Sequence, residues 1–235
     1  MRIAVVIPAR DEADGICAAV QSARAAGVEV LVVDGGSVDA PAARARAAGA
    51  RVLRAPPGRA RQMQAGAKAV GTGADAILFL HADTRLPAGY ADALRQALAN
   101  PRIAGGAFAL RFAERRLALR WVEWGLRLRL WLLRLPYGDQ AVFVRRSALM
   151  QLGGVPQAPI MEDLDLVRGI QRLGGFALLR SAVTTSARRY LERGVARTVW
   201  RNTLALAGWS LGLPRARLAA WYRGRRQVNP NRCRG

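Results

Sequence analysis

The chain has 235 residues, of which 51% are hydrophobic and 6% aromatic, a composition that suits one globular domain with a sizeable core. Its formal net charge is +21 and every basic residue except Lys68 is arginine, which favours anionic partners such as nucleotide phosphates or acidic lipid head groups. The chain has only two cysteines, which argues against a disulfide framework and a cysteine metal site. It has no apolar run long enough for a secretory signal or a membrane-spanning helix. We therefore expect a cytoplasmic protein.

Strands and helices are predicted to alternate over the first hundred residues. An apolar, Val-rich run at 3–9 predicts a strand, and apolar residues then recur at helical spacing up to Gly27. The same plan repeats, with strands expected at 28–33, 52–56 and 77–80, a helix that ends at Gly49, and helices at 59–70 and 90–99. This order is typical of βαβ units and predicts an α/β fold with a mainly parallel sheet flanked by helices.

The second half of the chain departs from this plan. Residues 105–113 alternate between apolar and polar, which favours an antiparallel or edge strand with one wet face. We expect short strands at 141–144 and 176–180, and a helix that begins with the acidic residues of MEDLDL. Amphipathic helices are expected at 115–135 and 195–226, and a disordered tail at 227–235. No linker separates two domains, so residues 1–226 are predicted to form one domain.

Acidic turns follow three of the predicted strands. Asp11 and Glu12 come after the first strand, Asp34 and Asp39 after the second, and Asp83 after the fourth. Because the carboxyl ends of parallel strands open on one edge of a sheet, we expect these carboxylates to converge there. The chain has neither the G-x-G-x-x-G nor the P-loop pattern, which argues against a dinucleotide site or a P-loop.

Five motifs in register resemble the family 2 glycosyltransferases, which have the GT-A (Rossmann-like) fold. IPARDE, VVDGGSVD and LFLHADT are similar to the nucleotide-sugar-binding half of that family, and PYGDQ and MEDLDL to its acceptor half. The resemblance covers about residues 3–190 and implies a donor half at about 1–100 and an acceptor half at 101–194. HADT, GGAF, PYGDQ, MED and TSARR together resemble a bacterial subgroup labelled as arsenosugar-biosynthesis-type transferases.

The resemblance implies transfer of a sugar from a nucleoside diphosphate sugar, by family habit a UDP-sugar. A divalent metal, Mn²⁺ or Mg²⁺, would neutralise the departing diphosphate, and Asp83 is the expected ligand. His81 stands where the family has the first acid of Asp-x-Asp, so it is expected either to bind the metal or to contact phosphate and sugar. The alternative for Asp83 is a helix or turn cap, and for His81 a hydrogen-bonded histidine at the end of the strand. The donor pocket is expected to include Pro8, Ala9, Arg10, Glu12, Asp34, Gly35 and Ala82, with Asp34 on the nucleobase or ribose.

Several arginines could contact the diphosphate. Arg59 and Arg61 precede a helix near the sheet edge and could clamp it with paired hydrogen bonds. In the resemblance a basic segment after the acidic helix closes over the diphosphate, which places Arg188 or Arg189 there. The alternative for all four is a solvated surface charge.

Inverting transfer needs a general base for the acceptor hydroxyl. The resemblance assigns that role to Asp163, with Glu162 orienting it or sharing its proton, whereas Asp165 is expected to be a surface or capping residue. The expected acceptor contacts are Gly105, Gly106, Asp139 and Gln140, and turn formation is the alternative for the last two. The acceptor itself is not specified.

The helices at 115–135 and 195–226 carry Trp and Leu on one side and Arg on the other. This pattern describes either a helix packed on the core or on a second copy, as in a homodimer, or a helix bound to the anionic inner face of the cell membrane. Nucleic acid is not expected, because no binding motif accompanies the charge. The alternative functions are a sugar nucleotidyltransferase, although IPARDE lacks the usual Gly-rich loop ending in Lys, and a non-catalytic basic binding protein.

Overall fold

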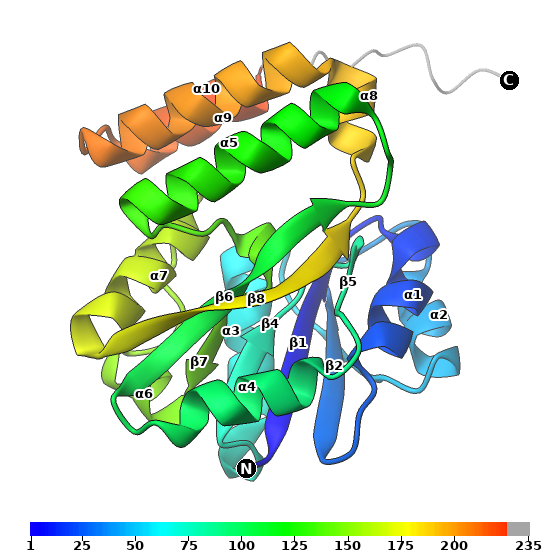
Figure 1. Cartoon of the computed structure of the whole chain (residues 1–235). Coiled ribbons are helices and arrows are strands. Elements are labelled where there is room, and N and C mark those ends of the chain that lie inside the picture. Colours follow the sequence, from blue (N-terminus) through cyan, green and yellow to red (C-terminus); the bar gives the residue numbers. More distant parts are fainter. Residues whose placement is uncertain (225–235) are drawn as a thin grey trace, which may run out of the picture.

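A computed structural model describes residues 1–224, so the predicted tail at 227–235 and the last two residues of the predicted helix at 195–226 lie outside the described residues. The described chain is organised around one eight-stranded sheet with the order β3-β2-β1-β4-β7-β6-β8-β5 (Figure 1). The strands are β1 (Ile3–Ala9), β2 (Val28–Asp34), β3 (Arg51–Arg54), β4 (Ala76–Phe79), β5 (Thr84–Arg85), β6 (Ile103–Phe112), β7 (Phe143–Arg145) and β8 (Gly175–Thr185).

The first half of the sheet is parallel and confirms the predicted alternation. β1 lies between β2 and β4, with Val5 opposite both Val30 and Leu78. These strands are buried on both faces, which is why their sequences read as continuous apolar runs. The intervening helices are α1 (Ala13–Ala23), α2 (Pro41–Ala47), α3 (Arg59–Ala69) and the short 3₁₀ turn Gly71–Gly73. The α/β prediction with a mainly parallel sheet is therefore confirmed.

The second half corrects two predictions. β6 is an interior strand that pairs antiparallel with β7 and parallel with β8, and its first half is buried on both faces, so it is not an edge strand with one wet face. β8 runs on to Thr185 instead of stopping at residue 180. Neither β5 nor helix α8 (Arg188–Arg193) was predicted. The other helices are α4 (Tyr90–Ala99), α5 (Leu117–Leu133), α6 (Arg146–Gln151), α7 (Glu162–Leu173), α9 (Val195–Ser210), α10 (Arg215–Arg223) and the 3₁₀ turn Gly138–Gln140.

Two apolar cores lie on opposite faces of the sheet. Helices α1, α2 and α4 bury residues such as Ile16, Ala45 and Leu94 on one face. Helices α3, α6 and α7 bury Met63, Leu149 and other apolar residues on the other face. The carboxyl ends of β1, β2 and β4 are left open between these layers, which is the edge where the acidic turns emerge.

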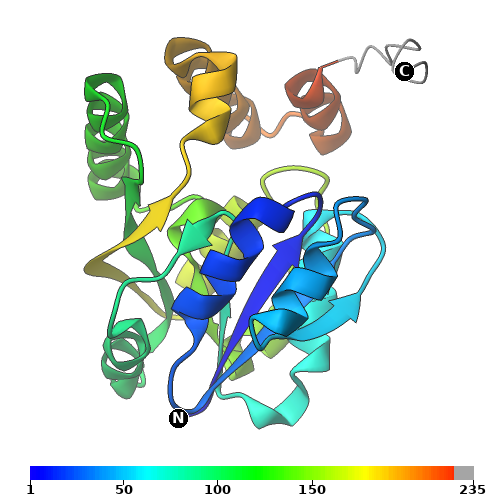
Figure 2. The same cartoon turned by 90° about the vertical axis from the view of Figure 1, so that its right-hand side faces the viewer.

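Helices α5, α9 and α10 form a further group at one end of the molecule, beyond the sheet (Figures 1 and 2). We call α5, α9 and α10 the helical layer. Asp165 in α7 anchors the layer: its Oδ1 accepts hydrogen bonds from Trp209 Nε1 at 2.8 Å and from Arg215 Nη2 at 2.9 Å. Asp165 is thus neither a free surface residue nor a cap. Within residues 1–224, no helix is both long and apolar enough to cross a bilayer.

Candidate active site

The loops after β1 and β2 are tied to each other at the open edge of the sheet. The buried Asp34 accepts hydrogen bonds at Oδ1 from the Ser37 backbone N–H at 3.1 Å and from Ser37 Oγ at 2.6 Å. Asp11 closes the link, because its Oδ1 accepts from the Val38 N–H at 2.9 Å and its own N–H donates to Ser37 Oγ at 3.0 Å. These bonds fix the two loops where Asp34 is expected to meet the donor nucleoside.

Gln62 of α3 supports the same loops and was not predicted. Its buried Nε2 donates to the carbonyls of Ala9 and Val33, both at 2.8 Å, and so joins the ends of β1 and β2. A Cβ at Gly35 would lie 2.8 Å from the Gln62 amide, which explains why this loop position is glycine. The only feature of the sequence that could have indicated this role is that Gln62 is a polar amide at a helix position that faces the core.

The HADT turn is held by a strand pairing that joins the two halves of the chain. Thr84 of β5 pairs with Thr185 of β8, and their hydroxyls lie 2.8 Å apart. The Ser186 N–H donates to the Asp83 carbonyl at 3.2 Å. The segment that precedes α8 is therefore fixed against the turn that carries His81 and Asp83.

A cavity of about 340 Å³ opens beside this turn. Its lining includes ionisable residues that were predicted to bind the donor and others that were predicted to bind or activate the acceptor. Helices α8, α9 and α10 also contribute to the lining, through Tyr190, Asn202 and Tyr222. Of the predicted site residues, the structure brings together His81, Asp83, Arg59, Asp139, Glu162 and Asp163.

The first turn of α7 presents two buried carboxylates to the cavity. Arg59 Nη1 lies 3.2 Å from Glu162 Oε1 and 3.6 Å from Asp163 Oδ2. Asp163 Oδ2 also accepts from the Gly138 N–H at 2.7 Å, and its Oδ1 accepts from the Leu164 N–H at 2.9 Å. A Cβ on Gly138 would overlap the Arg59 guanidinium, so glycine permits the close approach. These contacts orient Asp163 through three separate groups, the Arg59 guanidinium and two backbone N–H groups.

Burial and charge shift the pKa values of several groups around the cavity. Burial raises the pKa of Glu162. The Arg59 cation partly offsets this rise, and the neighbouring Asp163 charge adds to it. Burial also raises the pKa of Asp139 to about 6, against the opposing effect of the Arg129 cation. Burial by itself lowers the pKa of Arg59, but Glu162, Asp163 and Asp139 outweigh it and the pKa is raised, so the guanidinium stays charged.

Three buried side-chain atoms of cavity-lining residues lack a hydrogen-bond partner among the described residues. These are Arg59 Nε, His81 Nε2 and Asp139 Oδ1. Burial, together with the Arg59 and Arg189 cations, lowers the pKa of His81 well below its usual value, so the imidazole is neutral. A neutral His81 can accept a hydrogen bond from a substrate or ligate a cation, whereas a protonated one could not.

A metal site here would depend on substrate oxygens. Within residues 1–224, no group of three or more His, Cys, Asp or Glu side chains is placed to hold an ion. Asp83 and His81, whose Nε2 has no hydrogen-bond partner in the described chain, nevertheless supply two side chains at the cavity that can ligate a metal. Mn²⁺ and Mg²⁺ commonly take one or two protein ligands and complete their shell with water and phosphate. The residues present therefore fit a metal that arrives with a diphosphate.

Other predicted site residues lie elsewhere. Arg188 donates to Glu12 Oε2 at 2.8 Å, while Arg189 lines the cavity, so Arg189 is the better placed of the two to reach a diphosphate. Burial raises the pKa of Glu12 despite this pair. Arg61 is exposed and away from the cavity. The donor-loop residues Pro8, Ala9, Arg10, Glu12, Asp34, Gly35 and Ala82 also lie outside the cavity lining, around the strand ends beside it.

Gly105, Gly106 and Gln140, predicted as acceptor contacts, do not line the cavity. Both glycines are buried in β6, where a Cβ would strike the Phe143 carbonyl or the Ala177 carbonyl, so close strand packing requires them. Gln140 is 1% exposed, and its Nε2 donates to the Phe108 carbonyl at 3.1 Å. These three residues shape the sheet behind the cavity, whereas Tyr137, Gly138 and Asp139 of PYGDQ line it.

Comparison with known proteins gives one family match. Residues 4–149 match the sequence model of Glycosyl transferase family 2. A search of curated proteins finds no significant match.

Solved structures also match. A glucosyl-3-phosphoglycerate synthase from Mycobacterium tuberculosis, in complex with Mn²⁺, UDP-glucose and glycerol 3-phosphate, is 25% identical over 91% of this chain and 81% of its own, with a TM-score of 0.65. The same enzyme with Mn²⁺, UDP and glucosyl-3-phosphoglycerate gives 24% identity, 91% and 81% coverage, and a TM-score of 0.64. A mycobacterial protein is 27% identical over 79% of this chain and 65% of its own, with a TM-score of 0.53.

Proposed function

The chain belongs to glycosyl transferase family 2 and is a glycosyltransferase that uses a nucleotide-sugar donor; from this premise we propose that it is a metal-dependent inverting enzyme. The donor proposed is a UDP-sugar, bound with Mn²⁺ or Mg²⁺. The observation that carries the proposal is the single cavity in which His81 and Asp83 face Asp139, Glu162 and Asp163. A metal-diphosphate ligand and a general base are the two groups that sugar transfer requires on opposite sides of the anomeric carbon.

The donor side of the proposal rests on the open edge of the sheet. Asp34, fixed by Ser37, would contact the ribose or base, and the diphosphate would extend past the HADT turn to Asp83. When bound, the metal would supply Lewis-acid stabilisation of the departing diphosphate. Arg189, as a cavity-lining cation, would add charge stabilisation. The mycobacterial enzyme in complex with Mn²⁺ and UDP-glucose, at 25% identity, supports this choice of donor and metal.

The acceptor side is built on α7 and the Gly138–Gln140 turn. Asp163 would accept the proton of the attacking hydroxyl, because two backbone N–H groups and Arg59 hold its carboxylate in one orientation. Glu162, joined to the same guanidinium, would keep Arg59 in place. Asp139, with a free Oδ1, would hold an acceptor hydroxyl by hydrogen bonding.

Donor hydrolysis tests the assignment of the base. Many transferases slowly hydrolyse their donor with water as acceptor, so a screen of nucleotide sugars with Mn²⁺ should find one donor that the wild-type protein cleaves. Asp163→Asn should lower that turnover at least about 10²-fold, the usual size of a general-base contribution, with UDP binding retained. Asp165→Asn, a matched change two residues along the same helix, should keep turnover within a few-fold. Normal turnover in Asp163→Asn would move the base to another residue, with Asp139 the next candidate.

A further inference from the structure

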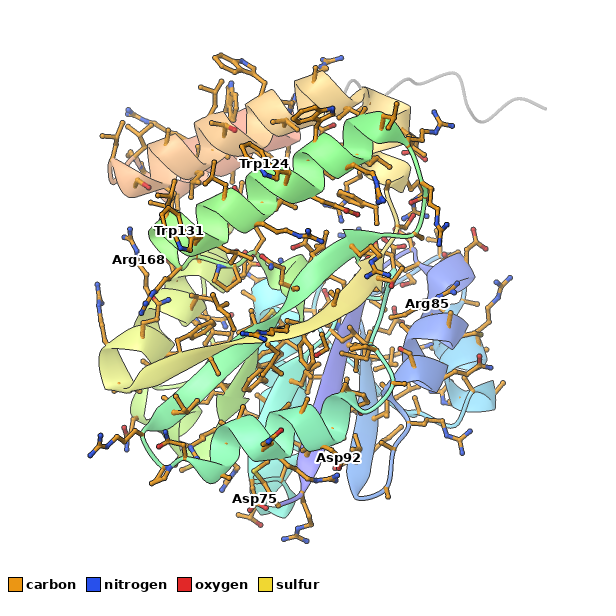
Figure 3. The ribbon with its side chains drawn as sticks, viewed as in Figure 1. Asp75, Arg85, Asp92, Trp124, Trp131 and Arg168 are labelled. Carbon is orange, nitrogen blue, oxygen red and sulfur yellow. The ribbon has the colours of Figure 1, made fainter. Side chains whose placement is uncertain are left out.

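The outer side of α5 carries an unusually large amount of exposed aromatic surface. Trp121, Trp124 and Trp131 are 74%, 59% and 76% exposed, and Figure 3 shows the latter two along the outside of this helix. They recur at intervals of three and seven residues, so they form one stripe along the helix, with Leu128 between them. The expectation that this face packs on the core of the same chain is therefore wrong. Trp side chains left in water on this scale mark an interaction site.

The same exposure continues over the rest of the helical layer. Trp200 of α9 and Trp221 of α10 are 63% and 45% exposed, and Leu211, just after α9, is 80% exposed. The one tryptophan that the layer buries is Trp209, which Asp165 anchors. Asn202 of α9 and Tyr222 of α10 line the cavity, whereas no residue of α5 does. The exposed tryptophans of the layer are left without a partner in the described chain.

The layer is also strongly basic. Its α5 segment holds a single acid, Glu123, whose carboxylate is already used by the Phe112 N–H at 2.7 Å. Arg120 and Arg127 each stand one residue before Trp121 and Leu128, so they flank the apolar stripe. In the described chain, no carboxylate forms an ion pair with the exposed arginines of the layer and its flanks, among them Arg115, Arg116, Arg120, Arg127, Arg134, Arg197, Arg217 and Arg223.

This charge decides between the two occupants that an apolar stripe could have. In a symmetric dimer the same patch meets itself, so the unpaired arginines of one copy would face those of the other. Like charges brought together in this way oppose association. An anionic bilayer offers the opposite charge, and its interfacial region is where Trp side chains are most stable. A helix with Trp and Leu on one face and Arg along its border is the pattern of an interfacial membrane helix.

We propose that the helical layer is a peripheral membrane-binding surface that docks the enzyme on an anionic lipid bilayer through the Trp121–Trp124–Trp131 stripe and its flanking arginines. The inference goes beyond the proposed sugar transfer and does not depend on it. Docking in this orientation places the bilayer against α5, which packs on α9, the helix that lines the cavity through Asn202. The helices lie along the membrane surface in this arrangement and do not cross it.

Vesicle co-sedimentation of the full chain tests the proposal. The probes are vesicles of phosphatidylcholine alone and with 30% phosphatidylglycerol. Wild-type protein should bind only the anionic vesicles, and raising the salt should weaken binding. The variant Trp121→Gln/Trp124→Gln/Trp131→Gln should bind at least about tenfold more weakly, because it removes the apolar contact at exposed positions. Arg120→Gln/Arg127→Gln should also lose about tenfold or more, since each arginine near an anionic surface contributes several-fold.

A matched pair separates this surface from general basicity. Arg46 and Arg102 are exposed, form no ion pair in the described chain and lie outside the layer, so Arg46→Gln/Arg102→Gln makes the same charge change elsewhere. It should alter vesicle binding by less than about twofold, because those side chains lie beyond the contact. All variants should keep the wild-type far-UV circular dichroism and its stabilisation by UDP with Mn²⁺, which makes failure of docking distinguishable from failure of the catalytic proposal.

Three results would overturn the proposal. The first is wild-type protein that fails to bind anionic vesicles at low salt. The second is a control pair that loses as much binding as Arg120→Gln/Arg127→Gln, which would show nonspecific attraction. The third is a wild-type dimer in light scattering that the Trp variant converts to monomer with vesicle binding unchanged, because a second copy would then cover the stripe.

Discussion

Arg59→Met gives the most direct energetic test of the candidate site's construction. The change removes the cation that lies 3.2 Å from Glu162 and 3.6 Å from Asp163, while the alkyl stem is largely kept. At an effective dielectric constant of about 20, each attraction is about 5 kcal/mol before desolvation is counted. Breaking a buried ion pair by removing one partner costs about 3–5 kcal/mol, and since the Arg59 side chain is 30% exposed we expect about 3 kcal/mol.

The loss should depend on pH with a definite sign. Without Arg59, the folded-state pKa of the buried Glu162 would rise further above that of the unfolded chain, because the cation that opposes the effect of burial is gone. Stability is then lost as pH rises through the window between the two values, so the deficit relative to wild type should be larger at pH 8 than at pH 5. Urea unfolding at both pH values measures it. Arg59→Met/Glu162→Gln should recover part of the loss at pH 8, because one stranded charge is removed.

Two outcomes would refute this reasoning. One is an unfolding free energy for Arg59→Met within about 0.5 kcal/mol of wild type, the range of an ordinary surface substitution. The other is an equal deficit at pH 5 and pH 8, which would show that lost packing, and not stranded charge, is responsible.

Two further predictions concern the neighbours of Asp163. Burial raises the folded-state pKa of Asp139 from 3.8 to about 6, so wild-type stability should fall as pH rises through that window. In urea unfolding, Asp139→Asn should therefore gain up to about 3 kcal/mol of stability relative to wild type between pH 4 and pH 7. A constant difference across this range would contradict the burial of Asp139. Gly138→Ala would force the Arg59 guanidinium aside and should cost about 1–3 kcal/mol, together with most donor hydrolysis. Gly125→Ala, where a Cβ meets nothing within 4 Å on α5, should be neutral or stabilising in the same assays.

The parallel half of the sheet could be predicted from the sequence, because the pattern of apolar and polar residues there follows which residues are buried. β1 and β4 are covered on both faces, so their strands read as apolar runs ended by the polar turns that reach the open edge. The edge position predicted for β6 failed because alternation is visible only at its end, around Arg111, whereas α4 and α7 cover the rest. β8 mixes polar and apolar residues along its length, and nothing local indicates that it reaches Thr185.

The candidate site shows the same division. The carboxylates at strand ends could be found from the sequence, since the topology of a parallel sheet brings such residues together. The pairing of Arg59 with Glu162 and Asp163, more than one hundred residues away, depends on how α3 meets α7 and leaves no local signal. Arg188 and Arg189 are adjacent and chemically identical, so only the start of α8 decides that Arg188 meets Glu12 while Arg189 faces the cavity.

UDP binding with and without Mn²⁺, for wild type and Asp83→Asn, is the measurement that tests the account most directly. Wild-type protein should be stabilised by UDP and Mn²⁺ together far more than by either alone, by an amount that follows RT ln(1 + [L]/Kd) in thermal unfolding. Asp83→Asn should lose the metal-dependent part, because it removes the charge that the ion needs. A wild-type protein that UDP and Mn²⁺ leave unchanged, or an Asp83→Asn variant with full Mn²⁺-dependent affinity, would contradict the placement of the donor at this edge of the sheet.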